Sequence, residues 1–129
     1  MPSSRSMKTI PCSSIVACLS LFAGCVTNDF KVVEALEIGL EMSEVETVVA
    51  AYGFNKEQSL TRPDDGWPET DDSYTNLAGR AEVVEDSKGI EIHQADYYPV
   101  GHGFLGYGWL FTFFDQDGKL VHYYRKQIN

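Results

Sequence analysis

The apolar positions of this chain follow a helical spacing first and an alternating spacing later. A first helix is predicted over residues 29–40, where four apolar residues recur at helical spacing: Phe30, Val33, Leu36 and Leu40. Asn28 or Asp29 is available as its N-cap, and Gly39 marks its expected end. This segment therefore offers one apolar face to a neighbouring element.

A second helix is predicted in the stretch MSEVETVVAAYG, residues 42–53. Ser43 and Glu46 have the spacing of a capping box, and Gly53 is placed to adopt the left-handed conformation that ends a helix. The apolar stripe consists of Val45, Val48, Val49 and Tyr52. Because isolated helices this short are marginal in water, both helices need a sheet to cover.

Residues 55–88 have the least regular pattern. The part from 61 to 74 has two prolines, a glycine and five acidic residues between Asp64 and Asp72, which favours a solvated loop. Trp67 is expected to pin this loop to the core, because a large aromatic side chain gains most by burial.

Three strands are predicted after this loop, in GIEIHQADYY (89–98), YGWLFTFF (107–114) and KLVHYYR (119–125). The last two are joined by Asp-Gln-Asp-Gly, residues 115–118, which is typical of a hairpin loop with glycine at positive φ. The predicted fold is α+β, with two short N-terminal helices packed on one face of a three-stranded antiparallel sheet. A fourth strand is compatible with the pattern.

The segment WLFTFF is apolar on both faces of its strand. Trp109, Phe111 and Phe113 share one face, and Leu110 and Phe114 lie around Thr112 on the other. Two helices cover only one face of such a sheet, so the second face needs the long loop or a partner. We predict that Trp109, Phe111 and Phe113 are exposed as partner-contact candidates, with burial in the core as the alternative.

The chain begins with the pattern of an export signal, assigned to residues 1–24. Arg5 and Lys8 precede an apolar run of 15 residues, Ile10 to Gly24, which is shorter than the roughly 20 residues of a membrane span. The run ends in Leu21, Phe22, Ala23, Gly24 and Cys25. These residues resemble the lipobox of bacterial lipoproteins, although an ordinary signal peptide remains the alternative.

The lipobox resemblance implies a lipid anchor at Cys25. Processing of this kind attaches diacylglycerol to the cysteine sulfur and acylates the new amino terminus, commonly with palmitate. Val26 is not the aspartate that retains lipoproteins in the inner membrane, so the implied location is the periplasmic side of the outer membrane. Residues 25–28 are then the lipidated cysteine and a short tether, and residues 29–129 form a single domain.

Charge and cysteine content limit the partners of the mature chain. Cys12 and Cys18 leave with the signal, so no intramolecular disulfide is expected. All 19 acidic residues and eight of the ten basic residues follow Cys25, a balance of −11. We expect no nucleic-acid binding from such a chain and infer a protein partner with a basic surface.

Acid-base or metal chemistry would have to use His93, His102 or His122. Their spacing matches no metal or catalytic motif, so a small hydrolase or metal-binding protein is only the third reading. GHGFLG, residues 101–106, has the spacing G-x-G-x-x-G, but strand rather than helix is predicted after it, which argues against a dinucleotide site. We therefore expect no catalytic residue, metal or cofactor.

The order of helix, GLEMSEVETVVAAYG, strands and LFTFFDQDGKLV resembles small outer-membrane lipoproteins of the SmpA/OmlA (BamE-like) type. It resembles more loosely the fold shared with β-lactamase inhibitor proteins. Met42, Ser43 and Glu46 match the family's helical phrase in one register, and Gly39, Glu44 and Val45 match it in another. Phe114 and Gly118 match its hairpin phrase. The resemblance implies a non-catalytic, lipid-anchored accessory of outer-membrane protein assembly or envelope integrity. The alternative is an inhibitor-like or ligand-binding module of the same fold.

Overall fold

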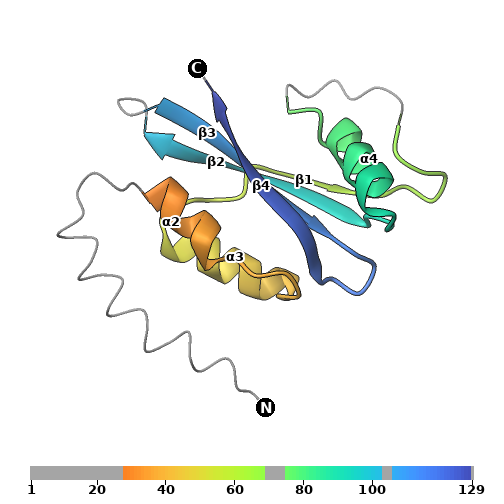
Figure 1. Ribbon diagram of the computed structural model, residues 1–129, viewed down its shortest axis with the longest axis horizontal. Coiled ribbons are helices and arrows are strands. Elements are labelled where there is room, and N and C mark those ends of the chain that lie inside the picture. The colour runs from red at the N-terminus through yellow and green to blue at the C-terminus, as the bar shows by residue number, and fades with distance from the viewer. Residues whose placement is uncertain (1–27, 69–74, 103–105, 129) are drawn as a thin grey trace, which may run out of the picture.

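The computed structural model describes residues 28–68, 75–102 and 106–128 and has an α+β architecture (Figure 1). In chain order the elements are α2 (Asn28–Ala35), α3 (Met42–Ala51), β1 (Gln58–Thr61), α4 (Leu77–Lys88), β2 (Gln94–His102), β3 (Gly106–Phe114) and β4 (Leu120–Ile128). The strands form one antiparallel sheet in the order β1-β2-β3-β4. The predicted fold class is confirmed, with the fourth strand present as β1.

The turn between β3 and β4 has the predicted hairpin chemistry. Gly118 adopts a φ of +78°, a conformation that suits glycine. The Asp115 carboxylate accepts hydrogen bonds from the backbone N–H groups of Asp117 and Lys119, at 2.9 and 3.0 Å. The acidic side chain and the glycine therefore close the loop together.

Helices α2 and α3 cover one face of the sheet, which we call the N-terminal face (Figure 1). Its core consists of Val32, Leu36, Val45, Val49, Tyr98, Val100, Leu110, Phe114 and Leu120. Each of these side chains is at most 3 % exposed, so burial of apolar area stabilises this contact. The prediction that two N-terminal helices pack on one face is confirmed.

Helix α4 covers part of the opposite face, which we call the α4 face (Figure 1). Its core consists of Trp67, Leu77, Ala78, Ala81, Val84, Ile92, Ala95, Tyr97, Phe111 and Phe113. The predicted exposure of Trp109, Phe111 and Phe113 is wrong for Phe111 and Phe113, which are both 0 % exposed. The reason is α4 itself, which forms in a segment that the sequence pattern assigned to irregular structure.

Trp67 anchors its loop as predicted. Its side chain is buried in the α4-face core, and its indole Nε1 donates a hydrogen bond to Glu85 Oε2 at 3.2 Å. The same carboxylate accepts from Arg62 and from the backbone N–H of Ile92. Glu85 therefore joins the loop, α4 and the chain that leads into β2.

The first helix is shorter than predicted, and a different face of it packs on the sheet. It ends at Ala35 rather than Leu40, because the chain around Gly39 (φ +100°) pairs with the start of β4. Asp29 faces the sheet and forms an ion pair with Arg125, at 2.5 Å between Oδ2 and Nη2. Phe30, which was predicted to face the core, lies outside it and stacks on the Arg125 guanidinium at 4.5 Å.

The capping box of α3 lies two residues earlier than predicted. The backbone N–H of Glu41 donates to Glu44 Oε1 at 2.8 Å, and Glu41 is the N-cap. Ser43 is inside the helix, where its carbonyl accepts from the Thr47 hydroxyl. Gly53 has the predicted left-handed φ, +94°.

The strand predicted over 89–98 begins only at Gln94. Gly89 ends α4 in a left-handed conformation with φ +71°, so the residues that follow first turn back towards the sheet. Ile92 is buried in this connection, whereas Ile90 is 38 % exposed.

Several predicted features lie outside the described residues. They are the signal segment 1–24, the lipid attachment at Cys25 with the tether, and parts of the acidic and glycine loops, at 69–74 and 103–105. Within the described ranges, none of the helices has the length and apolar character needed to cross a membrane.

Candidate functional site

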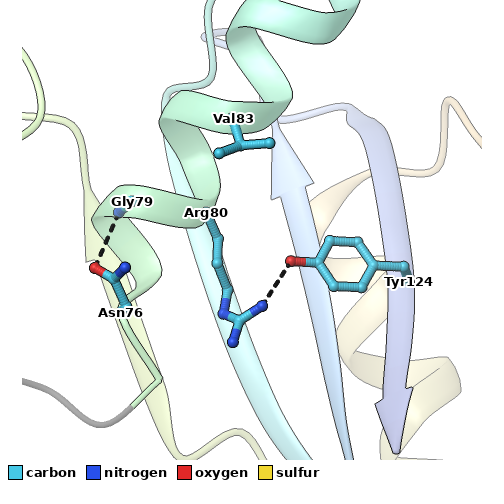
Figure 2. Close-up of a pocket in the computed structure, with 5 residues that line it drawn as sticks. All are labelled: Asn76, Gly79, Arg80, Val83 and Tyr124. Carbon is cyan, nitrogen blue, oxygen red and sulfur yellow. Dashed lines mark hydrogen bonds between the residues drawn. The ribbon is translucent and has the colours of Figure 1, made fainter.

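A shallow hollow lies between α4 and β4 on the α4 face. It is lined by Asn76, Gly79, Arg80, Val83 and Tyr124 and has a volume of about 280 Å³ (Figure 2). Val83 stands at its rim and is 66 % exposed. The hollow therefore combines a cation, a phenol and an exposed aliphatic side chain.

Arg80 extends from the second turn of α4 across the aromatic side chains of the sheet. Its Nε donates to the Thr75 carbonyl at 2.6 Å, and its Nη1 donates to Tyr124 Oη at 3.1 Å (Figure 2). The guanidinium carbon lies 4.3 Å from the centre of the Phe111 ring and 5.6 Å from that of Trp109. Stacking and hydrogen bonds thus hold this cation in one orientation.

Tyr124 belongs to a stack of aromatic rings that fixes its hydroxyl. Its ring centre lies 5.3 Å from that of Phe111 and 5.8 Å from that of Phe113. The strand register places Tyr124 opposite Phe111, so the buried phenylalanines position the phenol at the hollow. Phe111 and Phe113 therefore orient Tyr124 from the buried side of the hollow.

Trp109 borders the same region without being buried as Phe111 is. It packs edge-on against Tyr97 and Phe111, with ring centres 6.0 Å apart in both pairs. Lys126 lies directly opposite Trp109 in the β3–β4 register, hence on the same face. Of the three predicted contact candidates, Trp109 alone keeps partial access to solvent.

The cations around the hollow differ from most of the others in the described part of the chain. Four cations there form ion pairs: Lys56, Arg62, Lys119 and Arg125. Neither Arg80 nor Lys126 forms an ion pair with a carboxylate of the described residues. Arg80 and Lys126 therefore bring to the hollow two positive charges that these carboxylates do not neutralise, and Lys88 at the C-terminal end of α4 likewise forms no ion pair with them.

The N-terminus of α4 adds partial positive charge, because it is the positive end of the helix dipole. Asn76 is the N-cap, with φ +52°, and its side chain accepts from the Gly79 N–H at 3.3 Å (Figure 2). A Cβ on Gly79 would lie 2.4 Å from Asn76 Nδ2, so glycine is required for this cap. Helix N-termini favour negative charge, and this one borders the hollow.

The three histidines are not brought together. His122 pairs with Phe113, and Phe113 with Ala95 near the start of β2, whereas His102 ends β2 seven residues further on. At about 3.3 Å per residue this separation is roughly 23 Å. Within the described ranges no three His, Cys, Asp or Glu residues form a group able to hold a metal ion.

A second polar cluster lies under α3 on the N-terminal face. Asp96 is fully buried, and its Oδ1 accepts from Ser59 and Gln94 at 2.6 and 3.0 Å. Lys56 Nζ lies 3.6 Å from Oδ2. Burial, together with the Asp96 charge, raises the pKa of Tyr98 above its usual range, so the phenol stays neutral. This cluster is closed to large ligands and joins β1, β2 and α3.

The residues of the hollow were not among the candidates predicted from the sequence. Arg80 and Asn76 belong to the segment assigned to irregular structure, and Tyr124 was noted only as part of a strand. The available signal was Leu77, Ala81 and Val84, which recur at helical spacing after an asparagine cap and before Gly89.

Neither family models nor curated proteins nor solved structures gave a match to this chain.

Proposed function

We propose that this protein is a lipid-anchored periplasmic module that binds another protein through the α4-face hollow. The observation that carries this proposal is the grouping of Arg80 and Tyr124 with the exposed Val83 in one hollow, with Trp109 next to the Arg80 guanidinium. Arginine, tryptophan and tyrosine are the residues that most often dominate protein–protein binding energy. Here they sit on a rigid helix and sheet, so little ordering is needed on binding.

The lipid attachment is proposed at Cys25, on the lipobox-like flanks described above. If Cys25 is the first residue of the mature chain, about four residues separate it from Asp29, or at most roughly 14 Å. The mature balance of −11 repels anionic headgroups and favours a basic partner. Together with the resemblance to SmpA/OmlA lipoproteins, this supports an accessory role in outer-membrane protein assembly or envelope integrity.

An inhibitor-like or ligand-binding module is the second candidate function, because the hollow itself requires no lipid. The two candidates differ in what they expect of the anchor. A soluble inhibitor keeps its target binding when Cys25 is replaced by serine, whereas an accessory of a membrane machine loses its association.

The proposal is tested by affinity capture from envelope fractions, with Val83→Asp and Cys25→Ser as variants. Val83→Asp places a charge at the rim without touching the core, and Ile38→Asp is the matched control, because Ile38 is 60 % exposed and lies in the turn after α2. We expect Val83→Asp to lose the captured partner and Ile38→Asp to retain it.

The anchor is tested in the same preparation. Cys25→Ser should leave the outer-membrane fraction and lose the partner. Equal capture by wild type and Val83→Asp would reject the hollow as the contact. Recovery of Cys25→Ser in the outer membrane would reject the lipid attachment.

Association should also weaken as salt is raised, because a charge-steered contact is screened.

A further inference from the structure

Two hydrogen-bond donors in the hollow have capacity left after their bonds to the described residues. The Arg80 guanidinium carries five N–H groups, of which Nε and one on Nη1 are used. Tyr124 Oη accepts from Arg80, so its own hydrogen can be donated to a second acceptor. A planar acceptor with two oxygens fits the remaining guanidinium edge and this hydroxyl.

The dimensions of the hollow limit the size of its occupant. Its volume of about 280 Å³ is slightly below the range usual for ligand sites, about 300–1,000 Å³. The exposed Val83 side chain and the Tyr124 ring supply an apolar wall. The end of a chain fits this space better than a bulky cofactor does.

The local charge favours an anion with a single charge. Arg80, Lys126 and the α4 N-terminus act together, while the exposed Glu82 on the same helix opposes them. A phosphate carries up to two charges and would meet the strong negative field of the whole chain. A carboxylate costs less in this field and matches the guanidinium fork.

A chain terminus places both required groups on one residue. Its carboxylate and its side chain leave the same Cα, so the carboxylate reaches Arg80 and Tyr124 while an apolar side chain covers Val83. An internal Asp or Glu would bring backbone in from both sides and would supply no apolar group of its own. Capture of a C-terminal carboxylate is an established mode of peptide recognition.

We propose that the α4-face hollow binds the C-terminal carboxylate of a partner protein whose last residue is apolar. Arg80 and Tyr124 hold the carboxylate, and Val83 contacts the last side chain. This inference rests on the proposed function, since it names the group that the interaction module recognises.

The test uses the full chain in detergent micelles and a fluorescent hexapeptide that ends in phenylalanine. The peptide is compared as the free acid and as the C-terminal amide by fluorescence anisotropy. We expect the amide to bind at least about tenfold more weakly, because one charge-assisted hydrogen bond contributes roughly 1.5–3 kcal/mol.

Three variants assign the effect to the two donors. Tyr124→Phe keeps the ring and loses the hydroxyl, and Arg80→Lys keeps the charge and loses the fork, so both should reduce the preference for the acid. Lys119→Gln is the control, because Lys119 pairs with Glu41 beside the β3–β4 turn and its loss should leave the preference for the acid unchanged. Native near-ultraviolet circular dichroism of each variant shows that the fold is retained.

Two outcomes would overturn the proposal. The first is equal binding of acid and amide, and the second is displacement of the peptide by inorganic phosphate at equal concentration.

The carboxylate specificity of the hollow and the proposed function can each be rejected without rejecting the other. Loss of partner capture in Val83→Asp together with indifference to acid or amide would retain the module and reject its carboxylate specificity. Acid-selective binding together with unchanged capture would retain the carboxylate site and reject its role in partner binding.

Discussion

Phe113 and Phe114 are neighbours in the chain, but they belong to different cores. Phe113 packs under α4, and Phe114 packs under α2 and α3, because successive side chains of a strand point to opposite faces. Both are 0 % exposed. A strand that is apolar on both faces is therefore explained by two helical layers.

Phe113→Ala should destabilise the protein by about 3–5 kcal/mol, and Phe114→Ala by a similar amount, because each truncation leaves a cavity in a packed core. Urea denaturation followed by circular dichroism measures both values. Phe30→Ala is the control, since Phe30 is 53 % exposed, and it should cost much less. A cost below about 1 kcal/mol for Phe113→Ala would mean that α4 does not cover this face in solution.

His122 should make stability depend on pH. Burial lowers the pKa of His122 below its ordinary value of 6.5, and the positive charge of Lys88 lowers it further. Between the lowered pKa and 6.5 the unfolded chain binds more protons than the folded chain, so the free energy of unfolding rises with pH. Above pH 6.5 this contribution is fully present, and it is lost as pH falls through the lowered pKa.

Urea titrations from pH 5 to pH 8 check this dependence. The wild type should gain stability across the interval relative to His122→Gln. Lys88→Gln should reduce the gain, because it removes the smaller of the two causes. Parallel pH profiles for wild type and His122→Gln would contradict the assignment.

Residue chemistry could be predicted from the sequence where it is local. The left-handed glycines at 53 and 118 and the anchoring role of Trp67 follow from short stretches of sequence, and all three are confirmed. The orientation of Phe111 and Phe113 could not be predicted, because it depends on which other segment covers each face. The pairing of Arg80 with Tyr124 joins residues 44 positions apart and has no local signal.

At the level of the element, α3 shows how one capping pattern can hide another. S-x-x-E at Ser43 and E-x-x-E at Glu41 overlap in the sequence, and glutamate is not among the preferred N-caps. The choice is made by tertiary contacts: the Met42 N–H donates to the Gly118 carbonyl at 3.0 Å, and Lys119 pairs with Glu41 at 2.9 Å. These contacts fix the residue at which the helix begins.

Glu44→Ala should destabilise the protein by about 0.5–2 kcal/mol, because the Glu41 N–H loses its acceptor. Ser43→Ala should be nearly neutral, since the Ser43 side chain does not cap the helix. Thermal unfolding of both variants provides the measurement. A larger loss of stability in Ser43→Ala than in Glu44→Ala would instead support the capping box predicted from the sequence, Ser43 with Glu46.

Helix α4 could be predicted only in part. Its buried residues are Leu77, Ala78, Ala81 and Val84, and alanine gives a weak apolar signal although it favours helix. The preceding acidic, proline-containing stretch suggested continued loop. Small residues are what permit the close packing of this helix on the aromatic sheet, so the feature that weakened the prediction serves the fold.

At the level of the whole molecule, the Asp29–Arg125 pair ties the first described helix to the last strand. Both side chains are nearly buried, at 4 and 11 % exposure. Gly108 leaves room for them, because a Cβ there would lie 2.7 Å from Arg125 Nη2. The contact spans 96 residues of sequence, so it measures the integrity of the entire domain.

Asp29→Ala should cost about 3–5 kcal/mol, because it leaves the Arg125 cation buried without this carboxylate. The double variant Asp29→Ala/Arg125→Met should cost clearly less than the sum of the single changes, since no charge is then stranded. Urea denaturation of the four proteins in this cycle measures the coupling. Strict additivity would show that the pair contributes nothing in solution.

Arg125 and Tyr124 are consecutive residues of β4 that point to opposite faces of the sheet. Tension on the chain that precedes Asp29 would enter the sheet at Arg125, and the pull of an occupant of the hollow would enter it at Tyr124. The two forces would then act on adjacent residues of β4. They would load the hydrogen bonds between β3 and β4 in shear. In the proposed arrangement, a lipid tether and a bound partner would therefore be connected through strand β4 rather than through a loop.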